Sequence, residues 1–261
     1  MNASDAPSPG GELRRPRVVT IDGPAGCGKS TVVARLSEWL GARGVATVGF
    51  STGLVYRGLT WCALERGIDL ADARAVRALL RGVELGGVEL RVVELRGELR
   101  VEVDGHDPGE ALRTTRVTDA IHWIADDPEV RAALLPLQRA LPAGPVILSE
   151  GRDLGTVVYP DAAVKVYLTA SLEERARRRH SEFRDRLGEE ISLEEVQERI
   201  RRRDEHDSER EAAPLRPAED AVVIDTTTLA PEAVVEEILA EFPDDWFPPA
   251  APSGAGGGAD E

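Results

Sequence analysis

The amino-acid sequence predicts an α/β fold, in which a mostly parallel central sheet is flanked by helices. Residues 18–21, Val-Val-Thr-Ile, lead into a glycine-rich loop, and an apolar pattern with helical spacing follows at once. Short apolar runs such as 146–148 and 222–224 alternate with further helical patterns along the rest of the chain. Strands without polar alternation are typical of a parallel sheet that is covered on both faces.

The elements follow one another in the order that such a fold requires. Strands are expected at residues 17–22, 45–50, 146–148, 164–168 and 222–224. Helices are expected at residues 31–42, 51–65, 72–80, 116–125, 129–141, 171–186, 193–203 and 231–242. Gly41 and Gly44 end the first helix and Asp72 caps the third, because glycine and aspartate favour those positions.

Residues 83–104 differ in character from the rest of the chain. Apolar and charged residues alternate at 88–92 and again at 99–103, and Gly97 lies between the two runs. This pattern predicts a small antiparallel sheet with one solvent-exposed face, inserted into the main domain as a subdomain.

Composition limits the possible partners and location of the protein. The 261 residues carry a formal net charge of −15, which argues against nucleic acid or an anionic membrane as the main partner. Two cysteines provide no disulfide framework, and no run of about 18 apolar residues occurs. The segment Met1–Gly11 lacks the features of a signal peptide. We therefore expect a cytoplasmic enzyme.

Both ends of the chain are small, polar and rich in proline and glycine. We expect residues 1–15 to be a disordered leader and residues 243–261 to be a disordered tail. The single folded domain would then span residues 16–242.

The loop between the first strand and the first helix has the pattern Gly-x-x-x-x-Gly-Lys-Ser of a phosphate-binding loop. Its glycines allow consecutive backbone N–H groups to point at phosphate oxygens, and the helix N-terminus adds partial positive charge. Lys29 is one of only two lysines in the chain, and the pattern assigns it to the β- and γ-phosphates and Ser30 to Mg²⁺. We expect ATP to contact Gly23, Pro24, Ala25, Gly26, Cys27, Gly28, Lys29, Ser30 and Thr31.

Three polar segments follow predicted strands, at residues 20–22, 51–57 and 150–153. Because the carboxyl ends of parallel strands meet at one edge of a sheet, we expect these segments to share a cleft. Phosphoryl transfer requires cationic groups around both phosphates, and arginine has a planar fork that matches phosphate. The candidates are Arg57, Arg152, Arg203 and Arg210, although an arginine taken singly is more typical of a solvated surface.

Five stretches of the sequence resemble those of bacterial cytidylate kinases, which phosphorylate CMP and dCMP. They occur in the family's order between about residue 17 and residue 242, and the third is the most specific. The stretches are Ile21–Lys29, Thr52–Arg57, Gly151–Asp161, Arg203–Arg210 and Ala213–Leu215. The resemblance implies a P-loop kinase fold, an acceptor-binding insertion at about 51–142 and a helical lid at about 171–210.

The same resemblance implies roles for individual residues. The arginines of the acceptor phosphate fall on Arg57, Arg152, Arg203 and Arg210, and the acceptor of the sugar hydroxyl falls on Asp207. Contacts to cytosine fall on Arg131 and Asp153, and Thr52 and Tyr56 lie near the acceptor. Catalysis would rest on Lys29, Arg152, Arg203 and Arg210. The run Arg175–Arg179 would contact the donor phosphates, or else form a solvated helix face.

Two positions depart from the family pattern. His122 stands where the family often has a serine that touches the base, although a lone histidine there is more typical of a helix surface. Ser51 and Thr52 replace the usual Asp-Ser pair, so a hydroxyl is retained and a carboxylate is lost. Glu150, just after a buried strand, is a candidate to hold Mg²⁺ through water, and Cys27 is interpreted as a small residue that fills the loop.

The function implied is transfer of the γ-phosphoryl group of ATP to CMP or dCMP, with Mg²⁺ as cofactor, by a monomeric enzyme. Another monophosphate or small-metabolite kinase is the alternative within the same class. A GTP-dependent switch is excluded, because guanine recognition uses Asn-Lys-x-Asp and Asn2 is the only asparagine in the chain.

Overall fold

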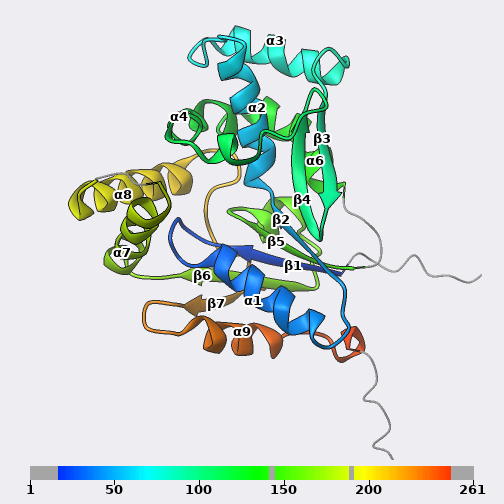
Figure 1. Ribbon diagram of the computed structural model, residues 1–261, viewed down its shortest axis with the longest axis vertical. Helices are drawn as coiled ribbons and strands as arrows, with labels where there is room; N and C mark the ends of the chain where they lie inside the picture. The colour runs from blue at the N-terminus through cyan, green and yellow to red at the C-terminus, as the bar shows by residue number, and fades with distance from the viewer. Residues whose placement is uncertain (1–16, 141–144, 188–190, 248–261) are drawn as a thin grey trace, which may run out of the picture.

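The structure is a computed structural model that describes residues 17–140, 145–187 and 191–247. Its centre is a seven-stranded sheet with the order β3-β4-β2-β5-β1-β6-β7 (Figure 1). The strands are β1 (Arg17–Asp22), β2 (Thr47–Ser51), β3 (Leu90–Leu95), β4 (Glu98–Val103), β5 (Val146–Gly151), β6 (Val164–Thr169) and β7 (Val222–Asp225). All neighbouring strands are parallel except β3 and β4, which confirms the predicted fold class.

Helices cover both faces of this sheet. The main helices are α1 (Lys29–Gly41), α2 (Gly53–Glu65), α3 (Ala73–Glu84), α6 (Pro128–Arg139), α7 (Leu172–Glu182), α8 (Leu193–Glu209) and α9 (Pro231–Leu239). On one face, α1 and α9 pack against β1, β5 and β6 through residues such as Leu36 and Ile238. On the other face, α2, α3 and α6 form a second core around Leu59 and Leu134. Helices α7 and α8 lie side by side at one end of the molecule in Figure 1.

The predicted antiparallel pair within residues 83–104 is confirmed as β3 and β4, but it extends the edge of the main sheet and does not form a sheet of its own. Strand β4 joins β2 through one parallel pair, Gly49 with Glu98, and Gly49 N donates to Gly97 O at 3.1 Å. The apolar face of the hairpin then packs against α2 at Gly58, where a Cβ would lie 2.7 Å from Val101 Cγ1. The absence of a side chain at Gly58 therefore allows this close approach.

The region expected to be one helix at 116–125 is instead divided. It forms α4 (Thr115–Ala120) and α5 (His122–Ala125), separated at Ile121, and the 3₁₀ turn Gly109–Arg113 precedes them. At its C-terminal end, α7 continues into a π-helical turn at Phe183–Leu187. A second π-helical turn, Leu154–Val158, follows β5.

Helix α8 reaches Glu209, six residues beyond the predicted end at 203. Residues 204–209 are all polar, so apolar periodicity gave no sign that they are helical. Asp204 and Asp207 nevertheless point inward, where Asp204 pairs with Arg175 and Asp207 pairs with Arg152. The end of this helix is thus anchored by ion pairs and not by apolar side chains.

The folded chain continues past Pro243, so the prediction of a disordered tail from residue 243 is wrong for residues 243–247. Residues Asp244–Trp246 form a 3₁₀ turn, and the Trp246 ring lies 5.2 Å from the Phe242 ring. The Phe247 ring lies 5.9 Å from that of Trp39 on α1. The expected leader at 1–15 and the remainder of the expected tail lie outside the described residues.

Candidate active site

The loop between β1 and α1, which is predicted to bind phosphate, turns at three glycines with positive φ. Gly23, Gly26 and Gly28 have φ values of 146°, 79° and 95°, which L-residues rarely adopt. A Cβ at Gly23 would lie only 2.1 Å from Leu168 O. The Lys29 ammonium group donates to Gly23 O at 2.9 Å and to Pro24 O at 2.7 Å, and burial lowers the pKa of this lysine. Lys29 is therefore held over the loop by neutral carbonyl groups.

Ser30, in the first turn of α1, contacts Glu150 near the C-terminal end of β5. Ser30 Oγ donates to Glu150 Oε2 at 2.7 Å. Among the described residues no group of three or more His, Cys, Asp or Glu side chains could hold a metal ion. A hydroxyl and a carboxylate fit Mg²⁺, which takes oxygen ligands and usually keeps water and substrate phosphate as the others.

Three of the predicted arginines converge on a single buried carboxylate. Asp207 Oδ2 lies 3.1 Å from Arg152 Nε and 3.9 Å from Arg203 Nε, and Asp207 Oδ1 lies 3.7 Å from Arg210. Burial raises the pKa of Asp207, but the three guanidinium groups outweigh it and bring the pKa below its ordinary value. Arg152 also donates to Gly23 O at 3.0 Å, so this cluster touches the phosphate loop.

Positive charge exceeds negative charge in this cluster. Burial, followed by repulsion from Arg152, lowers the pKa of Arg203 to about 9. Arg57 donates to Leu112 O at 2.7 Å and to Thr118 Oγ1 at 3.0 Å, and burial lowers its pKa to about 10. The arginines remain charged at pH 7, so the arrangement favours an additional anion.

Two arginines near this cluster were not predicted as parts of the acceptor site. Arg113 and Arg179 both repel Arg57 and so contribute to its lowered pKa. Arg179 belongs to α7, and Arg113 ends the 3₁₀ turn that precedes α4. Nothing in the local sequence distinguishes them from surface arginines, because the contacts arise from the tertiary structure.

The predicted base-binding residues form a second buried group. Arg131 on α6 and Asp153 after β5 form an ion pair, and Arg131 also donates to Ala125 O at 3.0 Å. The Arg131 guanidinium lies 5.3 Å from the centre of the Tyr56 ring, and burial raises the pKa of Tyr56 to about 12. Thr52, at the N-terminus of α2, is also buried, and its backbone N–H donates to Glu150 O at 3.2 Å.

His122 lies apart from this group. Its side chain is exposed, with Nδ1 2.8 Å from Asp119 O and the ring 4.8 Å from the ring of Trp123. Its other aromatic neighbour is His206 of α8, at 6.1 Å between ring centres. Among the described residues, no hydrogen bond or ion pair joins His122 to Arg131 or Asp153.

The arginines of α7 form hydrogen bonds and ion pairs mainly with other residues of the protein. Arg175 is buried and donates to Ala25 O at 3.2 Å in the phosphate loop, in addition to its ion pair with Asp204. Arg177 and Arg178 both pair with Glu174, and Arg178 also donates to Thr226 O at 2.6 Å. Cys27 is fully buried in the loop, as expected of a residue that fills space.

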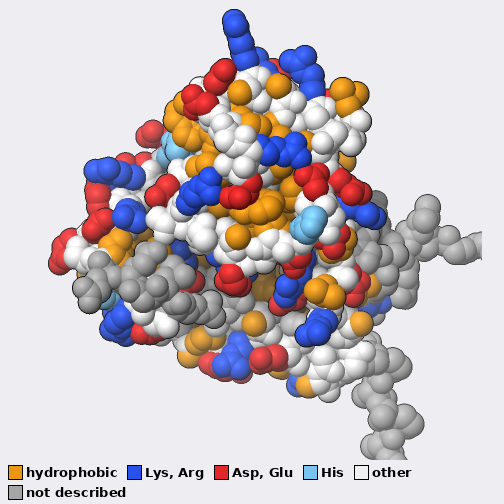
Figure 2. All heavy atoms as spheres, turned by 45° about the horizontal axis from the view of Figure 1, so that its top comes forward, with side chains coloured by type: hydrophobic (Ala, Val, Ile, Leu, Met, Phe, Trp, Pro, Cys, Tyr) orange, Lys and Arg blue, Asp and Glu red, His pale blue; other side chains and the backbone are white. Residues whose placement is uncertain are grey.

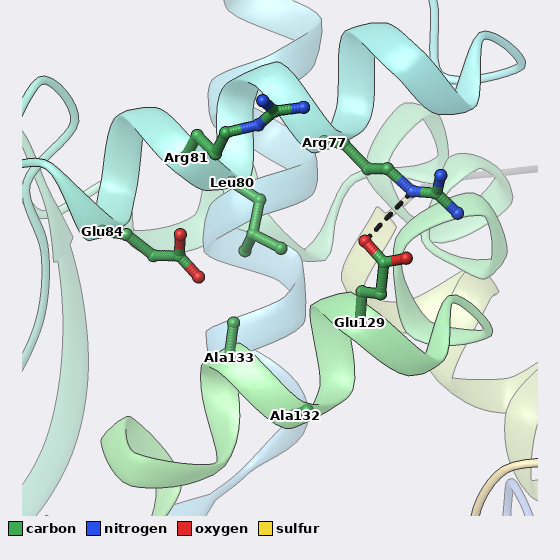
Figure 3. Close-up of a pocket in the computed structure, with 7 residues that line it drawn as sticks. All are labelled: Arg77, Leu80, Arg81, Glu84, Glu129, Ala132 and Ala133. Atoms are coloured by element: carbon green, nitrogen blue, oxygen red, sulfur yellow. Dashed lines mark ion pairs between the residues drawn. The ribbon is translucent and has the colours of Figure 1, made fainter.

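A hollow of about 430 Å³ lies between α3 and α6, away from the phosphate loop (Figure 3). Leu80 and the small residues Ala132 and Ala133 line it, and its charged residues Arg77 and Glu129 pair at 3.2 Å. None of the predicted site residues lines this hollow.

The face in Figure 2 shows acidic and basic side chains interspersed, without a large area of one charge.

The chain is similar to proteins of one family along most of its length. A sequence profile of the family described as cytidylate kinase matches residues 19–244. A protein named cytidylate kinase from Geobacillus kaustophilus (strain HTA426) is 46% identical over 227 residues, covering 87% of this chain and 96% of that protein. Another of that name from Stutzerimonas stutzeri (strain A1501) is 41% identical over 227 residues, covering 87% and 95%. The solved structure of TT1252 from Thermus thermophilus, at 23% identity and a TM-score of 0.41, is too distant to add to the argument.

Proposed function

The chain belongs to the cytidylate kinase family, and from this premise we propose that it transfers the γ-phosphoryl group of ATP to CMP and dCMP. The observation that carries the proposal is the arginine cluster around Asp207, which touches the phosphate loop through the bond from Arg152 to Gly23 O. The loop proposed to hold the donor phosphates therefore lies next to an excess of buried positive charge.

The residues of the loop and the cluster act mainly by holding charge. Lys29 and the loop N–H groups hold the donor phosphates, and Arg57, Arg152, Arg203 and Arg210 hold the acceptor phosphate. An oxygen of the acceptor phosphate then attacks the γ-phosphorus, and the bond to the ADP oxygen breaks. No strong general base is required, because a phosphate oxygen is already a competent nucleophile.

Ser30 and Glu150 would hold Mg²⁺, which when bound neutralises charge on the donor phosphates. Their mutual hydrogen bond supports this assignment, because it places two oxygen ligands beside the loop. Glu150 would act directly or through a water molecule.

The sugar and the base would be recognised by the two buried carboxylates. Asp207 Oδ2 is buried and lies at ion-pair distance from Arg152 and Arg203, but it accepts no hydrogen bond from the described residues, so a sugar hydroxyl could donate to it. Asp153 would accept from the cytosine amino group and Arg131 would donate to the ring nitrogen. Tyr56 and Thr52 would line the same pocket, whereas a contact from His122 would require its side chain to turn.

We further propose that residues 51–142 form the acceptor-binding insertion and residues 171–210 a lid over ATP. The contact of Arg175 with both the loop and α8 supports a connection between lid and donor site.

A cytoplasmic location is proposed because the substrates are intracellular and both cysteines are free. A monomer is proposed because the site is built from one chain. No described helix is long and apolar enough to cross a membrane.

An assay of ADP release tests the proposal directly. The protein is supplied with ATP and Mg²⁺ and with CMP, dCMP, UMP, AMP or GMP as acceptor. CMP and dCMP are expected to give the highest kcat/KM. A higher value for any other monophosphate would contradict the proposed acceptor and favour a different monophosphate kinase.

A further inference from the structure

Asp22, the last residue of β1, makes an unusual pair of contacts for a buried carboxylate. Its side chain is 4% exposed. Oδ1 accepts from the backbone N–H of Leu154 at 2.9 Å, and Oδ2 accepts from that of Gly155 at 2.8 Å. Among the described residues, no lysine or arginine forms an ion pair with it. Its two oxygens are therefore held by the backbone that follows Arg152 and Asp153.

The next residue, Gly23, links the phosphate loop to the segment that carries Arg152. Gly23 O accepts from Lys29 at 2.9 Å and from Arg152 at 3.0 Å. Asp22 and Gly23 thus connect the donor-phosphate loop with the segment that carries Arg152 and Asp153. Strands β1 and β5 are neighbours, with Asp22 opposite Gly151, but sheet pairing ends there. Beyond that point, the two bonds from Asp22 and the bond from Arg152 to Gly23 O connect the end of β1 to the residues that follow β5.

Stability alone does not explain a carboxylate at this position. Burial raises the pKa of Asp22 to about 6, although the two N–H groups act in the opposite direction. The ionised form present at pH 7 is therefore less favourable in the folded protein than in the unfolded chain. An ionised carboxylate does, however, accept both N–H groups at once, which a carboxamide of the same shape cannot do.

We propose that Asp22 is a positioning residue that sets Arg152 and Asp153 relative to Lys29, and so aligns acceptor with donor. The inference rests on the proposed roles of Arg152 and Asp153. Phosphoryl transfer depends on alignment, and a displacement of about 1 Å can reduce the rate by roughly 10²-fold. Asp22 itself need not touch either substrate.

The test compares the Asp22→Asn variant with the wild type. An asparagine oxygen accepts one N–H, while its NH₂ group faces the other. The backbone of residues 152–155, which follows β5, is therefore expected to shift. We expect kcat to fall by roughly 10- to 100-fold, the KM for CMP to rise, and the preference for CMP over UMP to narrow. The KM for ATP should stay within about twofold, because the phosphate loop keeps its own bonds. The Asp22→Ser variant, which also keeps one acceptor, carries the same expectation if Asp22→Asn does not fold.

The matched control is Val19→Ala, on the same strand. Val19 is fully buried in the core beneath α1 and has no polar contact with the site. Its truncation should lower Tm with both KM values and the base preference unchanged. This control separates loss of alignment from loss of stability.

Several results would overturn the assignment of Asp22. An Asp22→Asn variant with kcat within threefold of the wild type would do so. Equal increases in the KM for ATP and for CMP would also do so, as would the same kinetic changes in Val19→Ala. All comparisons use the monophosphate that the wild type phosphorylates fastest. A wild type that rejects CMP would therefore contradict the proposed function and still leave Asp22 tested.

Discussion

At the scale of single residues, the charge of Lys29 is held by main-chain carbonyls and not by a carboxylate. Those carbonyls belong to Gly23 and Pro24, at 2.9 and 2.7 Å. The ammonium group can therefore turn to phosphate without breaking an ion pair, which would be the stronger interaction.

The first prediction concerns this lysine. Lys29→Ala removes the loop's cationic side chain, and we expect turnover to fall by roughly 10³-fold, as for other losses of transition-state charge stabilisation. The fold should remain, because Lys29 is not part of either main apolar core. The measurements are kcat with CMP and the circular dichroism spectrum. Near-normal turnover in a folded variant would remove the phosphate loop from the proposed mechanism.

The second prediction concerns the pH dependence of stability at Asp22. Its folded pKa of about 6 lies above the ordinary value of 3.8. Its contribution to stability is therefore fully present below about pH 4 and is lost as the pH rises through 6. The difference corresponds to roughly 3 kcal/mol.

Urea unfolding of the wild type and of Asp22→Asn between pH 4.5 and 8 measures this effect. The wild type should lose stability relative to the variant as the pH rises, since only the wild type ionises at this position. A difference in unfolding free energy that is constant with pH would show that the pKa of Asp22 is not raised.

Residue patterns predicted the backbone of the glycine-rich loop after β1 but not the contacts that the neighbouring residues make. The glycine spacing that identifies the loop is local, and the positive φ values at Gly23, Gly26 and Gly28 agree with it. The bonds from Asp22 to Leu154 and Gly155 span more than 130 positions, so no local pattern reveals them. Arg113 was not predicted for the same reason, because it is brought near Arg57 only by the tertiary structure.

At the scale of elements, the C-terminal aromatic segment behaves as part of the fold. Trp246 is 6% exposed and packs against Phe242, just after the end of α9, and Phe247 contacts Trp39 of α1. Arg43 lies 3.5 Å from the centre of the Trp39 ring and completes this group. These contacts connect the end of the chain to its first helix.

The third prediction follows from this packing. Removal of residues 244–261 deletes Trp246 and Phe247 and should destabilise the protein by roughly 3–5 kcal/mol, as for other large buried aromatics. Removal of residues 248–261, which show no apolar pattern in the sequence, should leave Tm nearly unchanged. Thermal unfolding of the two truncations makes the comparison. Equal Tm values would show that the aromatic segment does not stabilise the fold.

Elements with apolar periodicity were predicted to within a few residues, and those held by polar contacts were not. Strand β1 and the Asp72 cap of α3 match the prediction. The last six residues of α8 were missed because buried ion pairs take the place of apolar contacts there. The tail was misjudged because two aromatic residues among prolines and acids do not form a periodic pattern.

At the scale of the whole molecule, the parallel sheet assembles the site from distant parts of the chain. The C-terminal ends of β1, β2 and β5 carry Asp22, Ser51 and Gly151, and the phosphate loop, α2 and the Arg152–Asp153 segment follow them. This convergence could be predicted, because parallel strands place such ends at one edge. The pairing of Asp207 with three arginines could not, because α8 approaches from a separate part of the chain.

The net charge of −15 makes the local excess of arginine at the site more significant. An acidic protein repels nucleotides at a distance, so binding must come from contacts at the site itself. For the base, those contacts are proposed to be Arg131 and Asp153, which are both buried and paired with each other.

Asp153→Ala would leave Arg131 buried without its partner and would destabilise the protein. Asp153→Asn keeps an acceptor oxygen and is the better variant.

The fourth prediction is the central one, that the chain selects cytosine through this pair. Cytosine presents an amino donor and a bare ring nitrogen, whereas uracil presents a carbonyl and an N–H. Sites with matched polar edges can reject a mismatched analogue by up to ~10⁴-fold. In Asp153→Asn, the amide NH₂ can donate to the uracil carbonyl, so the preference should narrow.

The most direct measurement is kcat/KM for CMP and for UMP, in the wild type and in Asp153→Asn. We predict a strong preference for CMP in the wild type and a ratio at least tenfold smaller in the variant, with kcat/KM for CMP reduced. A folded Asp153→Asn variant that keeps the wild-type ratio would contradict the account and place base recognition elsewhere, with His122 as the next residue to test.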